Sequence, residues 1–162
     1  MKAVTIKALK TELSNCSPNE LFKICLCLTK FKKENKELLS YLLFQSADEE
    51  GFINDLKTEI DFQFTQINSK NYYFIKKSVR KILRYVKSNI RYSKNKETEI
   101  ELLLYFCAVL KNSKPSIDQN LVLKNIFIRE IAGIKKKVAV LHEDLQYDYK
   151  LELDKLLSAD KV

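Results

Sequence analysis

The chain has 162 residues, the size of one domain, and its 46% of hydrophobic residues is enough for a core and excludes an intrinsically disordered protein. Two glycines and two prolines are too few for a sheet-rich fold or for the glycine-rich loops that bind nucleotides. The 29 basic and 21 acidic side chains give a net charge of +8, which alone does not identify a partner.

Apolar residues at helical spacing predict three helices in the first 45 residues. The first runs from about Val4 to Leu13, and the third begins near Asn35. Between them, Ser17 is followed by Pro18 and, three positions on, by Glu20. This arrangement is a capping box with proline at the first helical position, and it predicts the start of the second helix.

Three more helices are expected before the proline at position 115. The acidic run at 48–50 suits the positive end of a helix dipole and predicts the start of the fourth helix. The fifth helix is expected from about Asn71 to Tyr92, and the sixth begins near Lys96. Pro115 then ends the loop that follows the sixth helix.

A final apolar stripe runs from Leu123 to Leu156 in steps of three or four residues. One unbroken helix of this length would measure about 50 Å, which is long for a domain of this size. We therefore expect a bend or break between His142 and Asp148. The alternative is a single protruding helix that packs on a second subunit.

Together these segments predict an all-α chain with one domain over residues 1–162. Seven or eight helices with short connections fit either an irregular bundle or a short, HEAT-like α-solenoid. The longest apolar run, residues 102–110, is too short to cross a membrane, and lysines interrupt the first fifteen residues before a signal peptide can form. For these reasons we expect no membrane partner. The four cysteines lack the spacing of a disulfide framework, so we expect a cytoplasmic protein.

The whole positive excess lies between residues 62 and 96, a segment with ten basic residues and no acidic one. On a helix from 71 to 92, most of these residues fall within about 140° of arc, opposite an apolar face. Three of the four arginines of the chain lie here, and arginine pairs with phosphate through two parallel hydrogen bonds. The predicted polyanion-binding residues are Lys76, Lys77, Arg80, Lys81, Arg84, Lys87 and Arg91, with Tyr73 placed to stack on a base.

This basic helix predicts a binding or scaffold protein whose partner is nucleic acid, another polyanion or an acidic protein. The same pattern is also that of a face that is merely solvated, or that is neutralised by acidic residues near the C-terminus. A second function remains open, namely a protein-interaction module or homodimer that uses the stripe at 123–156. The acidic residues that would cover the basic face are Glu143, Asp144, Asp148, Glu152 and Asp154.

The sequence contains no recognisable catalytic or cofactor motif. His142 is the only histidine, and the acidic residues beside it point to different faces of a helix. Asp144, Asp148 and Glu152 do have a spacing of four, which is compatible with a divalent cation and leaves a metal-dependent enzyme as a third alternative. We predict a non-enzymatic protein with no cofactor, no catalytic residue and no metal ligand.

Overall fold

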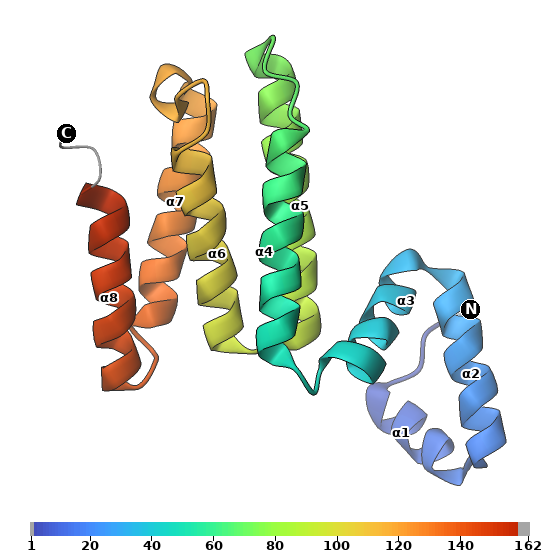
Figure 1. Ribbon diagram of the computed structural model, residues 1–162. Coiled ribbons are helices and arrows are strands. Elements are labelled where there is room, and N and C mark those ends of the chain that lie inside the picture. Colours follow the sequence, from blue (N-terminus) through green and yellow to red (C-terminus); the bar gives the residue numbers. More distant parts are fainter. Residues whose placement is uncertain (1, 159–162) are drawn as a thin grey trace. The chain divides into compact units, whose positions relative to one another are not determined.

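The computed structural model describes residues 2–158, and the regular structure of this range is helical, with eight α-helices and no strand (Figure 1). The prediction of an all-α chain with seven or eight helices is therefore confirmed. The chain divides into two compact units, an N-terminal unit up to Gln45 and a C-terminal unit from Ser46 onward. The prediction of a single domain over residues 1–162 depends on how these units associate, and it stays a prediction.

Three α-helices and a π-helical segment form the N-terminal unit. The capping box predicted at the start of the second helix is present, and it is confirmed by two reciprocal hydrogen bonds. The amide of Glu20 donates to the Ser17 hydroxyl at 3.3 Å, and the amide of Ser17 donates to the Glu20 carboxylate at 2.8 Å. The elements are α1 (Ile6–Asn15), α2 (Pro18–Phe31), α3 (Lys33–Ser40) and the π-helical segment Tyr41–Gln45.

The N-terminal unit has almost no interior. No residue of α1, α2 or α3 is buried, and in residues 2–45 only Tyr41 is. α2 packs along α3, and the side-chain amide of Asn35 donates to the backbone carbonyl of Leu28 at 2.8 Å. The hydrophobic side chains of this unit are therefore left mostly in contact with solvent.

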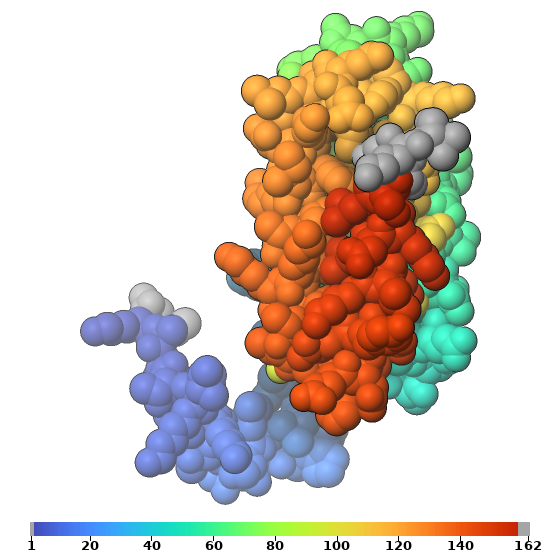
Figure 2. Space-filling model, turned by 90° about the vertical axis from the view of Figure 1, so that its left-hand side faces the viewer, coloured from blue at the N-terminus to red at the C-terminus, as the bar shows by residue number. Residues whose placement is uncertain are grey.

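Five α-helices and a short 3₁₀ turn form the C-terminal unit. α4, α6 and α8 lie side by side in one layer, and α5 and α7 form a second layer behind them (Figures 1 and 2). Successive helices alternate between the layers, as they do in a bundle or short solenoid. The elements are α4 (Glu49–Thr65), α5 (Tyr72–Ser93), α6 (Lys96–Lys111), the 3₁₀ turn Ile117–Gln119, α7 (Leu121–Val138) and α8 (Glu143–Ser158).

α6 is the central helix of the C-terminal unit, because it packs against α4, α5 and α7. Three consecutive leucines, at 102, 103 and 104, are all buried, so more than half of the circumference of α6 is covered. Phe106 has no exposed surface, and its ring lies 5.9 Å from that of Phe64 on α4. Despite such apolar content, none of the helices in the described part of the chain is long and apolar enough to cross a bilayer.

The C-terminal stripe is divided between two helices that pack on each other. α7 ends at Val138 and α8 begins at Glu143, so the break covers residues 139–142 and overlaps the predicted interval of 142–148 at His142. The single protruding helix considered above is therefore not formed. Five residues of the stripe are buried within the chain, namely Leu123, Ile131, Ile134, Val138 and Leu153.

Candidate polyanion interface on α5

α5 is an uninterrupted helix of 22 residues, which corresponds to a length of about 33 Å. It begins where the Asn71 side chain accepts a hydrogen bond from the amide of Tyr73 at 2.8 Å. It ends at Lys94, whose φ of 58° places it in the left-handed region and stops the helix. These bounds agree with the predicted helix from Asn71 to Tyr92 to within one residue.

The apolar side of α5 fixes the direction of its charged side. Six residues on this side are between 1% and 7% exposed, and the helix packs against α4 and α6. Rotation of α5 would expose them, so the opposite side is held toward solvent. The six residues are Ile75, Val79, Ile82, Leu83, Val86 and Ile90.

The first three turns of α5 carry the most concentrated part of the predicted site. Five of its residues line a hollow of about 320 Å³, and all five belong to α5. Lys81 is exposed beside this hollow but does not line it. In the described chain, no carboxylate forms an ion pair with any cation of this group. We call the group the N-terminal cationic cluster: Tyr73, Lys76, Lys77, Arg80 and Arg84, with Lys81 beside them.

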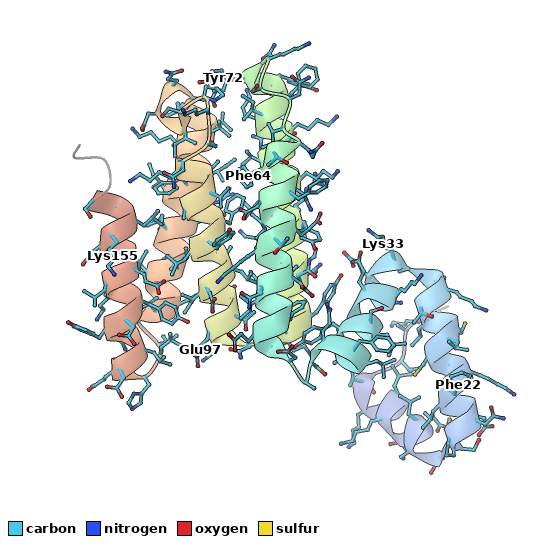
Figure 3. All side chains as sticks on the ribbon, in the orientation of Figure 1. Phe22, Lys33, Phe64, Tyr72, Glu97 and Lys155 are labelled. Atoms are coloured by element: carbon cyan, nitrogen blue, oxygen red, sulfur yellow. The ribbon has the colours of Figure 1, made fainter. Side chains whose placement is uncertain are left out.

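Two aromatic rings stand at the start of the cluster. Tyr73 is 62% exposed, and its ring meets the edge of Phe74 with centroids 5.4 Å apart. Phe74 is itself 45% exposed. The neighbouring Tyr72 points elsewhere, since its hydroxyl hydrogen-bonds the side chain of Gln119 at 3.0 Å at this end of the unit (Figure 3). Tyr73 and Phe74 are thus available for stacking, and Tyr72 is not.

The last turns of α5 differ from the first ones, because their cations have partners. Lys87 Nζ lies 2.8 Å from the carboxylate of Glu130 on α7, and Glu130 is only 5% exposed. Arg129 Nε lies 3.1 Å from the other oxygen of Glu130. Arg91 donates to the Ser88 hydroxyl at 3.4 Å. The structure therefore divides the eight predicted site residues into two groups. The six N-terminal residues form no ion pair among the residues described, although Arg84 Nε donates to the carbonyl of Arg80 at 3.4 Å. The C-terminal pair, Lys87 and Arg91, contacts other side chains of the fold.

The acidic residues of α8 lie on the other layer of the unit. Asp148 and Glu152 line a hollow of about 460 Å³ with Glu101 of α6 and Lys57 of α4, whose ammonium lies 2.6 Å from the Glu101 carboxylate. Among the residues described, no ion pair joins a carboxylate of α8 to a cation of the N-terminal cationic cluster. Within one chain, the described carboxylates of α8 therefore do not pair with the N-terminal cationic cluster.

Three groups in this unit hold their protons more tightly than usual. Burial, followed by the charges of Glu101 and Glu97, raises the pKa of Tyr149 to about 12. Burial and a 2.6 Å hydrogen bond to Asp61 raise the pKa of Tyr105 to about 12. Burial, reinforced by the charge of Glu130, raises the pKa of the Cys107 thiol to about 12. All three are therefore neutral at physiological pH.

These raised pKa values predict a loss of stability in alkali. In the unfolded chain the two tyrosines and the thiol ionise at about pH 8.5–10, whereas in the folded chain they stay protonated to about pH 12. The unfolded state then binds fewer protons, so the free energy of unfolding falls as pH rises from about 9 to 12. Urea unfolding followed by circular dichroism at several pH values measures this slope. Replacing Tyr105 and Tyr149 with phenylalanine should flatten it, and an unchanged slope would contradict the assignment.

The carboxylates at 144, 148 and 152 have a spacing compatible with a divalent cation, but the sequence analysis predicts no metal site. Within residues 2–158, no group of three or more histidines, cysteines, aspartates or glutamates is arranged to hold a metal ion. His142 Nδ1 lies 3.4 Å from the Asp144 carboxylate, and both side chains are strongly exposed. The absence of an enzymatic activity and of a cofactor stays a prediction.

Sequence reasoning missed two residues that shape this interface. Phe74 extends the aromatic surface beside Tyr73, and the run of three aromatic residues at 72–74 is a signal of it. Glu130 forms an ion pair with Lys87, so Lys87 is not free to bind a ligand. The sequence signal for the burial of Glu130 is its place on the apolar stripe of α7, four residues from both Ile126 and Ile134.

Comparison with known proteins gives no relative from which a role can be carried over. No protein-family model matches the chain, and no curated protein or solved structure is similar enough to count as a match. The function has to be inferred from the geometry of the chain itself.

Proposed function

We propose that this chain binds the phosphate backbone of nucleic acid through the N-terminal cationic cluster of α5. The observation that carries the proposal is the set of five cations, Lys76, Lys77, Arg80, Lys81 and Arg84, on an outward face without a matching carboxylate. A row of cations on one helix face is the electrostatic footprint of a phosphate-binding surface.

The chemistry of the cluster suits phosphate in particular. Arg80 and Arg84 are one helical turn apart, and each guanidinium offers two parallel donors to a phosphate. Tyr73 and Phe74 stand at the end of the row, where an unpaired base can stack on them. Phosphate contacts carry no sequence information, so we expect little sequence preference and stronger binding to single strands.

The other candidate functions have less support. The homodimer built on the stripe at 123–156 would need apolar residues that are packed inside the C-terminal unit. An acidic protein is the alternative partner for the same cationic cluster, and it offers no base for Tyr73 to stack on. A cytoplasmic location belongs to this proposal and rests on cysteines that lack a disulfide pattern.

Salt dependence of binding tests the proposal. If four or five phosphates are contacted, the logarithm of the affinity for a fluorescent oligonucleotide should fall with the logarithm of salt concentration at a slope of about −3 to −5. Fluorescence anisotropy with single-stranded and double-stranded probes gives this slope, and polyglutamate serves as the competitor that represents an acidic protein. Absence of binding at low salt, or tighter binding to polyglutamate than to the oligonucleotide, would contradict the proposal.

A further inference from the structure

Two side chains of α7 continue the basic face of α5 across the second layer of the C-terminal unit. Arg129 and Lys136 are seven residues apart, close to two full turns, so they lie within about 20° of each other on the helix. Both are exposed, Arg129 by 67%. They lie about 140–160° around α7 from Ile134, which has no exposed surface. The outward side of α7 therefore carries cations, as the outward side of α5 does.

A buried carboxylate joins the two helices and directs Arg129. One oxygen of Glu130 lies 2.8 Å from Lys87 Nζ of α5, and the other accepts a hydrogen bond from Arg129 Nε at 3.1 Å. Two cations share one carboxylate, so the group remains positive. The terminal guanidinium nitrogens of Arg129 form no hydrogen bond with any described residue. Glu130 thus holds the guanidinium through one nitrogen and leaves its other donors free for a phosphate.

The outward sides of α5 and α7 present no carboxylate in the part of the chain that the structure describes. α5 contains no acidic residue, and the only one in α7 is the buried Glu130. Lys136 has no ion pair with a described residue, whereas its neighbour Lys137 lies 3.6 Å from Glu99 of α6. The second layer therefore forms one basic face that is wider than α5.

We propose, on the basis of the function proposed above, that a single strand bound by the N-terminal cationic cluster continues across α7 and contacts Arg129 and Lys136. α5 and α7 both run from the top to the bottom of Figure 1. The contact between Lys87 and Glu130 sets their register, so Lys136 lies level with the last turn of α5.

The length of this row predicts how much of a strand it holds. At 1.5 Å per residue, the N-terminal cationic cluster extends about 12 Å along α5, from Lys76 to Arg84. The row from Lys76 to Lys136 extends about 25 Å, because α7 adds its own cations beyond the level of Lys87. Phosphates repeat regularly along a strand, so the full row covers about twice as many nucleotides as the cluster alone.

Oligothymidylates of two lengths separate contacts on α7 from contacts on α5. The variant Arg129→Gln with Lys136→Gln removes both charges, while Lys87 still pairs with Glu130. We expect it to lose at least about tenfold in affinity for a probe of about 15 nucleotides, and less than about threefold for one of about 5. In the wild type, the salt dependence should be steeper for the longer probe by about one to two.

A charge-matched control and a second variant complete the experiment. Lys150→Gln with Lys155→Gln, on α8 in the other layer, should bind both probes within about threefold of the wild type. Lys136→Glu changes a side chain without a described partner, so it should fold normally and lose affinity for the longer probe only.

The outcomes distinguish this inference from the proposed function. A wild-type chain that binds neither probe contradicts the proposed function, and the extension across α7 fails with it. If the wild type binds and the α7 variants bind the longer probe equally well, the proposed function stands and the extension is overturned. An equal loss for both probes would also overturn it, because the shorter probe does not reach α7.

Discussion

Replacing both Arg80 and Arg84 with glutamate is expected to weaken oligonucleotide binding at least about 100-fold. Each arginine contributes a charge-assisted hydrogen bond worth roughly 1.5–3 kcal/mol, and glutamate adds repulsion from the phosphates. Loss of two contacts should also reduce the steepness of the salt dependence by about two. Fluorescence anisotropy at several salt concentrations measures both effects.

A matched variant separates this effect from a general change in charge. Lys150→Glu with Lys155→Glu reverses the same number of charges on α8, in the other layer of the unit, and both lysines are exposed. This control should bind within about threefold of the wild type, because a distant, exposed charge acts only through a screened field. Equal losses for the two variants would mean that the binding surface is not the N-terminal cationic cluster. Both variants should unfold within about 0.5 kcal/mol of the wild type.

Truncation of Phe106 to alanine should cost the C-terminal unit about 3–5 kcal/mol of its free energy of unfolding. The side chain has no exposed surface and packs near Phe64 at the centre of the unit, so its removal leaves a cavity that the surrounding helices cannot fill. A typical domain is stable by only 5–15 kcal/mol, so the loss is a large part of the total. Urea unfolding monitored by circular dichroism provides the measurement.

Phe62→Ala is the appropriate comparison for this variant. Phe62 lies on α4 of the same unit, but it is 58% exposed, so its truncation removes little buried surface. Its expected cost is about 0.5 kcal/mol, the usual range for surface substitutions. If both variants were destabilised equally, the central position of α6 in the unit would be wrong.

Most of the helices could be predicted because their signals are local. The Ser17 capping box, the acidic start of α4 and the strict apolar periodicity of α5 each involve residues within a few positions of one another. The charged face of α5 was predictable for the same reason, since helical geometry alone places its cations together.

The features that sequence reasoning missed are tertiary ones. The pairing of Lys87 with Glu130 joins residues 43 positions apart, and no local pattern connects them. The break between α7 and α8 was expected, but the burial of its stripe within the chain depends on how the helices stack. The exposure of the apolar residues of α2 is equally beyond the sequence, because periodicity shows that a face is apolar and not what covers it.

The separation of charge between the two layers of the C-terminal unit has a kinetic consequence. Cations on α5 and carboxylates around Tyr149 lie on different layers, so the unit carries an electric dipole as well as its net charge. In the field of a long polyanion, this dipole exerts a torque that turns α5 toward the approaching strand before contact. A larger fraction of collisions would then occur in an orientation that allows binding. This pre-alignment would weaken as added salt shortens the range of the field.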